Sequence, residues 1–238
     1  MKTPTQQRTF LTAEWKNLVM LNYAVERALL QSFVPSGTEL DQFEGVTYAS
    51  LIGFEFNKTQ VMGHAIPFHQ SFEEVNLRFY VRRESRRGVV FIRELVPKHA
   101  VSALARLAYG ERYSCVPMSH RVETDADRMT AEFSWGSGAG RCSIEAQTSG
   151  LGYLPAEGSL GEFITEHYWG YTARGEGTLE YQVEHPQWQI REANAARFSG
   201  DAERYYGQLF AHVLERPPDS AFIVEGSAVT VFKGTPIT

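Results

Sequence analysis

The sequence predicts an α+β protein in which antiparallel strands dominate and a few short helices flank them. Apolar and polar residues alternate over residues 72–82, which is the period of a strand in an antiparallel sheet. Residues 88–96 form a second such segment across an arginine-rich turn, so the two are expected to form a hairpin. The clearest helical spacing follows at residues 101–108, where Gly110 is expected to end the helix.

The first part of the chain is expected to contain a strand, a short helix and another strand. The strand covers residues 10–23, and Leu18 and Met20 interrupt its alternation. Its apolar face carries Leu11, Ala13, Trp15, Val19, Leu21 and Tyr23. Residues 25–34 have helical spacing, and residues 46–56 have the β-branched and aromatic side chains typical of a strand.

The second half continues with strands and two helices. The expected strands are residues 114–123, 129–135, 141–148, 178–184, 187–192 and 221–232. A short helix is expected at residues 159–166, where Ser159 and Glu162 have capping-box spacing, and another from Asp201 to about residue 214. The segments at 178–184 and 187–192 are expected to pair with each other as a hairpin.

Composition and charge narrow the classes of partner. The chain has 238 residues, of which 43% are hydrophobic, and no repeat or long linker, so residues 1–238 are expected to form one domain. A net charge of −5 disfavours binding to nucleic acid. No run approaches the ~18 apolar residues of a membrane helix, and the N-terminal residues lack the apolar core of a signal peptide. We therefore expect a cytoplasmic protein with no membrane partner, and a homo-oligomer stays possible.

Four segments resemble a known family. FLTAEWKNLVMLNYAV, FHQSFEEVNLRFYVR, RRGVVFIRELVP and EHYWGYT are similar to the bacterial YqjF-like domains of unknown function, which are similar in turn to the acetoacetate decarboxylases. The resemblance implies a bent antiparallel β-barrel of the acetoacetate-decarboxylase-like type, with an interior pocket and a few short flanking helices. It also places Glu74 at the position of an acidic residue of the decarboxylases and Lys16 at that of a basic residue on the N-terminal strand.

One element of the decarboxylases is absent. Their Schiff base forms on a lysine that follows a strand-and-helix unit, whereas the corresponding loop here, residues 109–115, reads YGERYSC and has no lysine. Neither arginine nor tyrosine forms an imine under these conditions, and Lys98 begins the preceding helix, about 18 Å away along its axis. We expect Arg112 and Tyr113 to contact a ligand in a pocket that does not perform Schiff-base decarboxylation.

The candidate site lies on the polar face of residues 72–82. Glu74, Asn76 and Arg78 alternate along this face, and if it is enclosed the glutamate and arginine can hold each other or bind a carboxylate. The alternative is that the face meets solvent. Three functions stay open: a protein that binds a small organic acid or aromatic metabolite, an enzyme that uses Glu74 for acid–base chemistry without an imine (a lyase, hydrolase or isomerase), and an interaction module whose barrel is filled by side chains.

Other chemistry-bearing residues have plainer interpretations. His64 and His69 match no zinc signature, so we expect no metal and no cofactor. His167 and His185 each follow a glutamate, but neighbouring residues of a strand point to opposite faces, which favours structural roles. The YWGY run at residues 168–171 either stacks against a flat ligand or packs in the core. The turn arginines either bind an anion or are solvated; they are Arg82, Arg83, Arg86 and Arg87.

Overall fold

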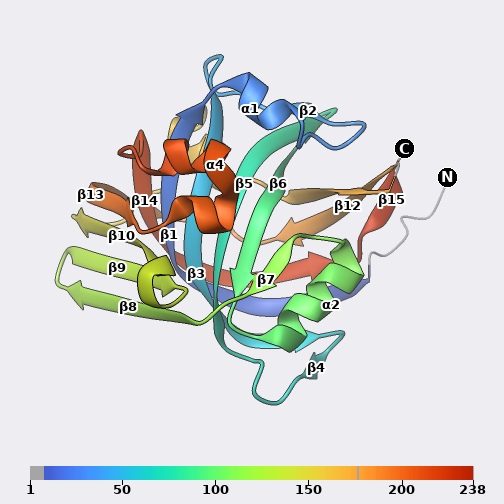
Figure 1. Cartoon of the computed structure of the whole chain (residues 1–238), viewed down its shortest axis with the longest axis horizontal. Coiled ribbons are helices and arrows are strands. Elements are labelled where there is room, and N and C mark those ends of the chain that lie inside the picture. Colours follow the sequence, from blue (N-terminus) through green and yellow to red (C-terminus); the bar gives the residue numbers. More distant parts are fainter. Residues whose placement is uncertain (1–7, 176, 238) are drawn as a thin grey trace.

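The computed structural model describes residues 8–175 and 177–237. Residues 1–7, which the sequence analysis examined for a signal peptide, lie outside the described residues, as does the side chain of Ala105 on the expected helix. Within the described part, fifteen strands join one sheet, with short helices beside it, which confirms the α+β class (Figure 1). No described helix is long and apolar enough to cross a membrane.

The elements follow one another in this order: β1 (Thr9–Val25), α1 (Arg27–Gln31), β2 (Glu39–Leu40), β3 (Thr47–Val61), β4 (His64–Ala65), β5 (Phe72–Arg83), β6 (Arg86–Val96), α2 (His99–Tyr109), β7 (Tyr113–Cys115), β8 (Met118–Asp125), β9 (Arg128–Trp135), a 3-10 turn (Gly138–Gly140), β10 (Cys142–Ser149), α3 (Leu160–Thr165), β11 (Trp169–Arg174), β12 (Gly177–Glu184), β13 (Ile190–Ser199), α4 (Ala202–Leu214), β14 (Ser220–Phe232) and β15 (Thr235–Ile237).

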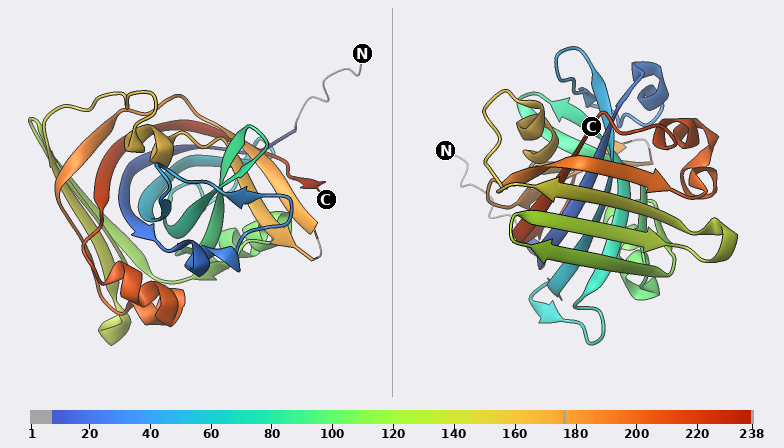
Figure 2. Two further views of the ribbon diagram at one scale, coloured as in Figure 1. Left: turned by 90° about the horizontal axis from the view of Figure 1, so that it is seen from above. Right: turned by 90° about the vertical axis from the view of Figure 1, so that its left-hand side faces the viewer.

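Strand pairing closes part of the sheet on itself. β12 pairs with both β11 and β14, so β12, β11, β6, β5, β3, β1 and β14 form a closed cycle of pairings. Four further strands, β13, β10, β9 and β8, extend the sheet beyond β14 and lie side by side in the right-hand view of Figure 2. Most strand pairs are antiparallel, as expected, but β6 pairs in parallel with β7 and with β11. The intervening chain includes α2 before β7, and such a crossover is what parallel pairing requires.

Several expected elements are confirmed. β5 and β6 form the predicted hairpin, and the strands expected at 129–135 and 141–148 are present as β9 and β10, which pair across the GSGAG segment at residues 136–140. The hydroxyl of Ser159 accepts a hydrogen bond from the backbone N–H of Glu162 at the start of α3, and the carboxylate of Asp201 does the same for Arg204 in α4. Each cap satisfies a backbone donor that the helix itself leaves unpaired.

Two expectations about the strands are wrong, one about a pairing and one about the extent of a strand. β12 forms a hairpin with the preceding β11, and β13 pairs instead with β10 and β14. Gly175, with φ 62°, allows the tight β11–β12 turn, whereas the chain after Glu184 leads to a different part of the sheet. The segment at 114–123 is two strands, β7 and β8, with Pro117 between them, because proline cannot donate to the ladder.

Irregularities in the long strands decide which side chains face inward. Asn17 in β1 has φ 55°, and the strand register shifts there. After this bulge Leu18 and Met20 pack in the same cluster as Ala13, whereas Val19 and Leu21 pack in the cluster on the other side. The single apolar face expected for residues 10–23 is therefore wrong beyond Asn17, because one extra residue reverses the alternation.

Candidate functional site

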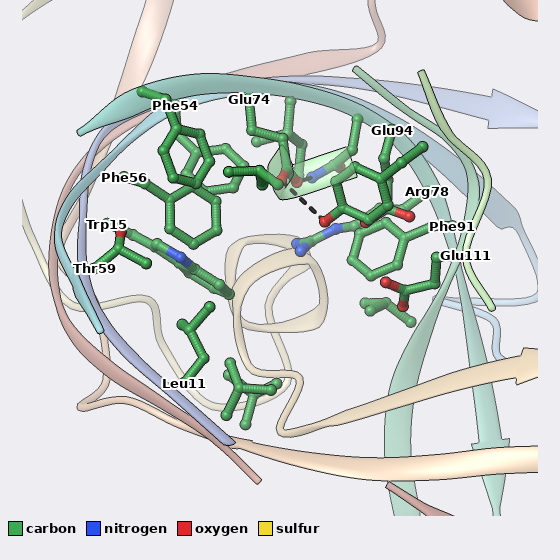
Figure 3. Close-up of a pocket in the computed structure, with 18 of the residues that line it drawn as sticks. Leu11, Trp15, Phe54, Phe56, Thr59, Glu74, Arg78, Phe91, Glu94 and Glu111 are labelled. Atoms are coloured by element: carbon green, nitrogen blue, oxygen red, sulfur yellow. Dashed lines mark hydrogen bonds between the residues drawn. The ribbon is translucent and has the colours of Figure 1, made fainter. Parts of the chain in front are cut away.

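A cavity of about 150 Å³ lies against one face of β5 (Figure 3). Its walls come from β1, β3, β5, β6, α2, β12 and the segment that joins α3 to β11. An apolar cavity of this volume accommodates a molecule such as benzene. The cavity therefore fits a ligand of about six to eight non-hydrogen atoms.

The inward face of β5 carries polar residues. Glu74, Asn76 and Arg78 line the cavity, and the side chains of Glu74 and Asn76 are each only 3% exposed. The opposite face of the strand packs in the main hydrophobic core through Val75 and Leu77. Both faces of β5 are thus covered, and the alternative in which the polar face meets solvent is wrong.

Two further carboxyl groups join Glu74, and the sequence analysis missed both. Glu94 reaches the cavity because the β5–β6 register shifts between Leu77 and Arg78, which brings Glu94 onto the side of β6 that carries Phe91. Glu111 follows Gly110, whose φ of 74° lets the chain turn after α2. The sequence could have pointed to Glu111 in one way only: it lies in the loop at residues 109–115, which corresponds to the lysine-bearing loop of the decarboxylases.

Hydrogen bonds orient two of these carboxyl groups. Asn76 Nδ2 donates to Glu74 Oε1 over 3.0 Å, and the Tyr113 hydroxyl donates to Glu74 Oε2 over 3.1 Å. The Tyr181 hydroxyl donates to Glu111 Oε1 over 2.5 Å. Glu94 differs, because its Oε2 is buried without a hydrogen-bond partner. An unpartnered buried carboxyl oxygen is costly, so this atom is available to hydrogen-bond with a group that enters the cavity.

Burial shifts the proton equilibria of the three acids. Loss of solvent raises the pKa of Glu74 to about 7, against the opposing effects of the Asn76 and Tyr113 hydrogen bonds and the charge of Arg78. Loss of solvent likewise raises the pKa of Glu111 to about 7. The pKa of Glu94 lies well above its ordinary value, through burial and then the neighbouring charges of Glu111 and Glu74. The cluster therefore holds protons near neutral pH and can exchange them.

Arg78 brings a guanidinium group into the cavity. Its Nη2 donates to the carbonyl oxygen of Ile164 over 3.2 Å, and its Nε is buried without a partner. It is the only arginine or lysine among the described residues that line the cavity, and Figure 3 shows its nitrogen atoms near the middle of the space. Part of its hydrogen-bonding capacity is thus available to a ligand.

His167 is a further polar residue of the cavity. It is 6% exposed, its ring stacks on Tyr80 at 4.6 Å, and neither ring nitrogen has a hydrogen-bond partner. Burial, followed by the charges of Arg87 and Arg78, holds the pKa of His167 well below its ordinary value, so the ring is neutral. The sequence favoured a structural role for His167, because position along the chain does not reveal burial in a cavity.

The other wall of the cavity is aromatic. The rings of Trp15 and Phe54 meet edge to face at 5.3 Å, and Phe56 stacks on Phe72 at 4.7 Å. Figure 3 shows Trp15, Phe54 and Phe56 together on one side, with Glu94 and Glu111 on the other. One side of the cavity is therefore aromatic, and the other carries the acids together with apolar residues such as Phe91. This is a usual arrangement for sites that bind small molecules.

Two residues proposed as ligand contacts lie outside the cavity. Lys16 is 51% exposed and pairs with Glu14 over 3.4 Å. Arg112 is exposed, and its guanidinium carbon lies 5.8 Å from the ring centre of Phe33. The structure does not bring either side chain into the cavity, because adjacent residues of extended chain point to opposite sides: Trp15 faces the cavity next to Lys16, and Tyr113 next to Arg112. Among the described residues that line the cavity there is also no lysine.

The remaining histidine candidates do not assemble into a metal centre. His69 lies at the edge of the cavity with its Nδ1 2.8 Å from the carbonyl oxygen of Pro67, and His64 is exposed. His185 lines the cavity and stacks on Trp188 at 3.9 Å. Within residues 8–175 and 177–237 no group of three histidine, cysteine, aspartate or glutamate side chains is placed to hold a metal ion.

Solved structures share this fold. The enduracididine biosynthesis enzyme MppR, complexed with pyruvate, superposes with a TM-score of 0.73 and 12% identity, covering 100% of this chain and 93% of that chain. An acetoacetate decarboxylase-like enzyme from Sphingomonas wittichii RW1 superposes with a TM-score of 0.67 and 11% identity, covering 96% of this chain and 93% of that one. These likenesses show an acetoacetate-decarboxylase-like fold.

Sequence comparison identifies the family. The uncharacterized protein YqjF of Bacillus subtilis (strain 168) is 25% identical over 183 residues, which cover 76% of this chain and 75% of that protein. Residues 12–228 match the family DUF2071, described as an uncharacterized conserved protein. This match spans most of the strands and every wall of the cavity except residues 10, 11 and 231. The chain belongs to the DUF2071 family.

Proposed function

We propose that the protein binds a small organic acid with an apolar or aromatic body, inside a decarboxylase-like barrel formed by the closed cycle of strands. The observation that carries the proposal is Arg78, a guanidinium that lines the cavity and has a buried, unpartnered Nε. A carboxylate is the natural complement, because the planar guanidinium can donate two parallel hydrogen bonds to it.

The surroundings of Arg78 support a small acid. The neutral ring of His167 adds hydrogen-bonding capacity without competing charge. The aromatic wall around Trp15 offers apolar contact to the body of the ligand. A neighbour of the same fold is described as complexed with pyruvate, an acid of the size that the cavity fits.

Calorimetric titration with matched acids and amides tests the proposal. Pyruvate, butyrate and benzoate are compared with butyramide and benzamide, which have similar shape and no charge. We expect binding by at least one acid and, in Arg78→Met, a loss of about 100-fold in affinity, the range expected for hydrogen bonds between charged groups. Arg82→Met is the matched control, because Arg82 lies on the same strand and pairs with Glu39 at the surface. Equal affinity of the amides, or unchanged affinity in Arg78→Met, would contradict the proposal.

The buried acids favour a second candidate, an enzyme that moves a proton on the bound acid without an imine. The pKa values of Glu74 and Glu111, each about 7, suit proton exchange at neutral pH. Deuterium incorporation into the methyl group of pyruvate, beside its ketone carbonyl, followed by NMR, reports such a step. We expect Glu74→Gln to slow it by about 100-fold; undiminished exchange in this variant would contradict the role of Glu74. A lysine adduct trapped by borohydride would contradict the imine-free route.

A further inference from the structure

The polar groups of the cavity separate into a basic group and an acidic group. Arg78 and His167 both lie against Tyr80: the guanidinium carbon is 5.7 Å from the centre of its ring, and the imidazole stacks on it. Arg78 also bonds to the carbonyl oxygen of Ile164 at the end of α3. The basic group therefore lies where β5 meets α3 and the chain that follows it.

The acidic group lies on the wall that β6 and the loop after α2 form. Glu111 lies close enough to Glu94 for its charge to raise the pKa of Glu94, and the Tyr113 hydroxyl donates a hydrogen bond to Glu74. Both described hydrogen bonds to Glu111, from Tyr181 and Thr172, go to Oε1. Glu94 Oε2 is buried without a hydrogen-bond partner, and neither described hydrogen bond to Glu111 uses Oε2, so both atoms can accept from another donor.

A simple carboxylate complements only the basic group. Among the described residues that line the cavity, three carboxyl groups face one guanidinium. A ligand whose one polar group is a carboxylate satisfies Arg78, adds negative charge near three acids and leaves Glu94 Oε2 without a donor. A ligand that also carries a protonated nitrogen supplies that donor and offsets the acidic charge, because an ammonium group has three N–H donors and no acceptor.

We propose that the ligand is a small zwitterion, an amino acid or related amino-carboxylate, whose carboxylate contacts Arg78 and whose ammonium group contacts Glu94 and Glu111. This inference rests on the proposed function, since it keeps Arg78 as the carboxylate contact, and adds the second charged group. The aromatic wall then contacts the carbon chain between the two charges, and the cavity volume limits that chain to a few methylene groups.

Proton linkage separates the zwitterion from the simple acid. Because burial holds the pKa of Glu111 at about 7, part of the population is protonated near neutral pH. An ammonium group beside it favours the carboxylate, so binding releases protons. A simple carboxylate in the same cavity has the opposite effect and takes protons up. The sign of proton exchange therefore reports which kind of charge reaches the acidic group.

The experiment uses pairs of ligands that differ only by an ammonium group in place of a methyl group. The pairs are β-alanine with butyrate, 4-aminobutyrate with pentanoate, and 5-aminopentanoate with hexanoate. Each is titrated calorimetrically at neutral pH in phosphate and in Tris, whose different ionisation heats reveal proton release or uptake. We expect at least one amino acid to bind about tenfold more tightly than its methyl partner and to release protons.

Variants assign the ammonium contact. Glu111→Gln and Glu94→Gln are expected to abolish the preference for the amino ligand, while Glu145→Gln, at a carboxylate paired with Arg197 on the surface, keeps it. A methyl ligand that binds as tightly as its partner, still dependent on Arg78, overturns the zwitterion and leaves the proposed function standing. If no ligand of either kind binds, both are overturned. The sign of proton exchange in the unaltered protein decides the matter even if a variant fails to fold.

Discussion

Two regions on the hairpin of β5 and β6 use arginine in opposite ways. At the turn, every arginine pairs with a carboxylate: Arg82 with Glu39 at 2.9 Å, Arg83 and Arg86 with Glu180 at 3.6 and 2.7 Å, and Arg87 with Asp41 at 2.8 Å. In the cavity, Arg78 has no ion-pair partner among the described residues, although three carboxyl groups line the same space.

The turn arginines are neutralised within the fold, whereas the charge of Arg78 is the one that we propose a ligand neutralises. The paired arginines at the turn join β5 and β6 to β2, β12 and the chain after β2, and neither of the two sequence interpretations, an anion site or a solvated turn, included these pairs. The cavity keeps buried polar atoms unsatisfied, which costs stability. Proteins keep such destabilising features mainly at functional sites, where the binding of a ligand can compensate for the lost stability.

The largest expected effect is on the pH dependence of stability, and it concerns the cavity. Because the folded pKa of Glu111, about 7, exceeds the ordinary 4.5, the folded protein holds a proton that the unfolded chain has lost. Stability therefore falls as the pH rises between these values, by about 3 kcal/mol for this group. Glu111→Gln keeps an oxygen that accepts from Tyr181 and is expected to flatten this fall.

Urea unfolding at pH values from about 5 to 8 measures this change. The opposite result would be a gain in stability of the unaltered protein relative to Glu111→Gln over that range. Glu111 would then titrate like a solvent-exposed carboxylate, and the contrast between the cavity and the turn would be wrong.

A smaller effect is expected at the turn. Glu180→Gln removes the common partner of Arg83 and Arg86 and is expected to destabilise the protein by about 1 kcal/mol, since those arginines are partly exposed. High salt should shrink the difference, because it screens ion pairs near the surface. Urea unfolding at low and high sodium chloride checks this, and a stabilising substitution would show that the turn also carries uncompensated charge.

The smallest effect is expected for the two basic residues outside the cavity. Lys16→Met and Arg112→Met should leave the affinity for any cavity ligand within about twofold, since charge screening weakens interactions through solvent. Calorimetric titration of the same ligand into Lys16→Met, Arg112→Met and Arg78→Met compares the three affinities directly. A tenfold loss in either variant would require the side chain to enter the cavity on binding.

Much of the fold was predictable because local patterns suffice for it. The alternation at residues 72–82 identified β5, and capping residues identified the starts of α3 and α4. The errors came from features with weak local signals. The β1 bulge at Asn17 appeared in the sequence only as the broken alternation at Leu18 and Met20, and the pairing of β12 depends on β11 and β14 rather than on the residues next to it.

The sequence by itself determined that Glu74, Asn76 and Arg78 share one face of a strand, because strand alternation is a property of the backbone, and that residues 109–115 contain no lysine. Only the tertiary structure decided that this face is enclosed and that Glu94 and Glu111 join it. Enclosure depends on strand pairings between distant segments, and the position of Glu94 depends on a one-residue register shift in β6. Long-range contacts of this kind, rather than local propensity, determine which charged side chains are buried away from water.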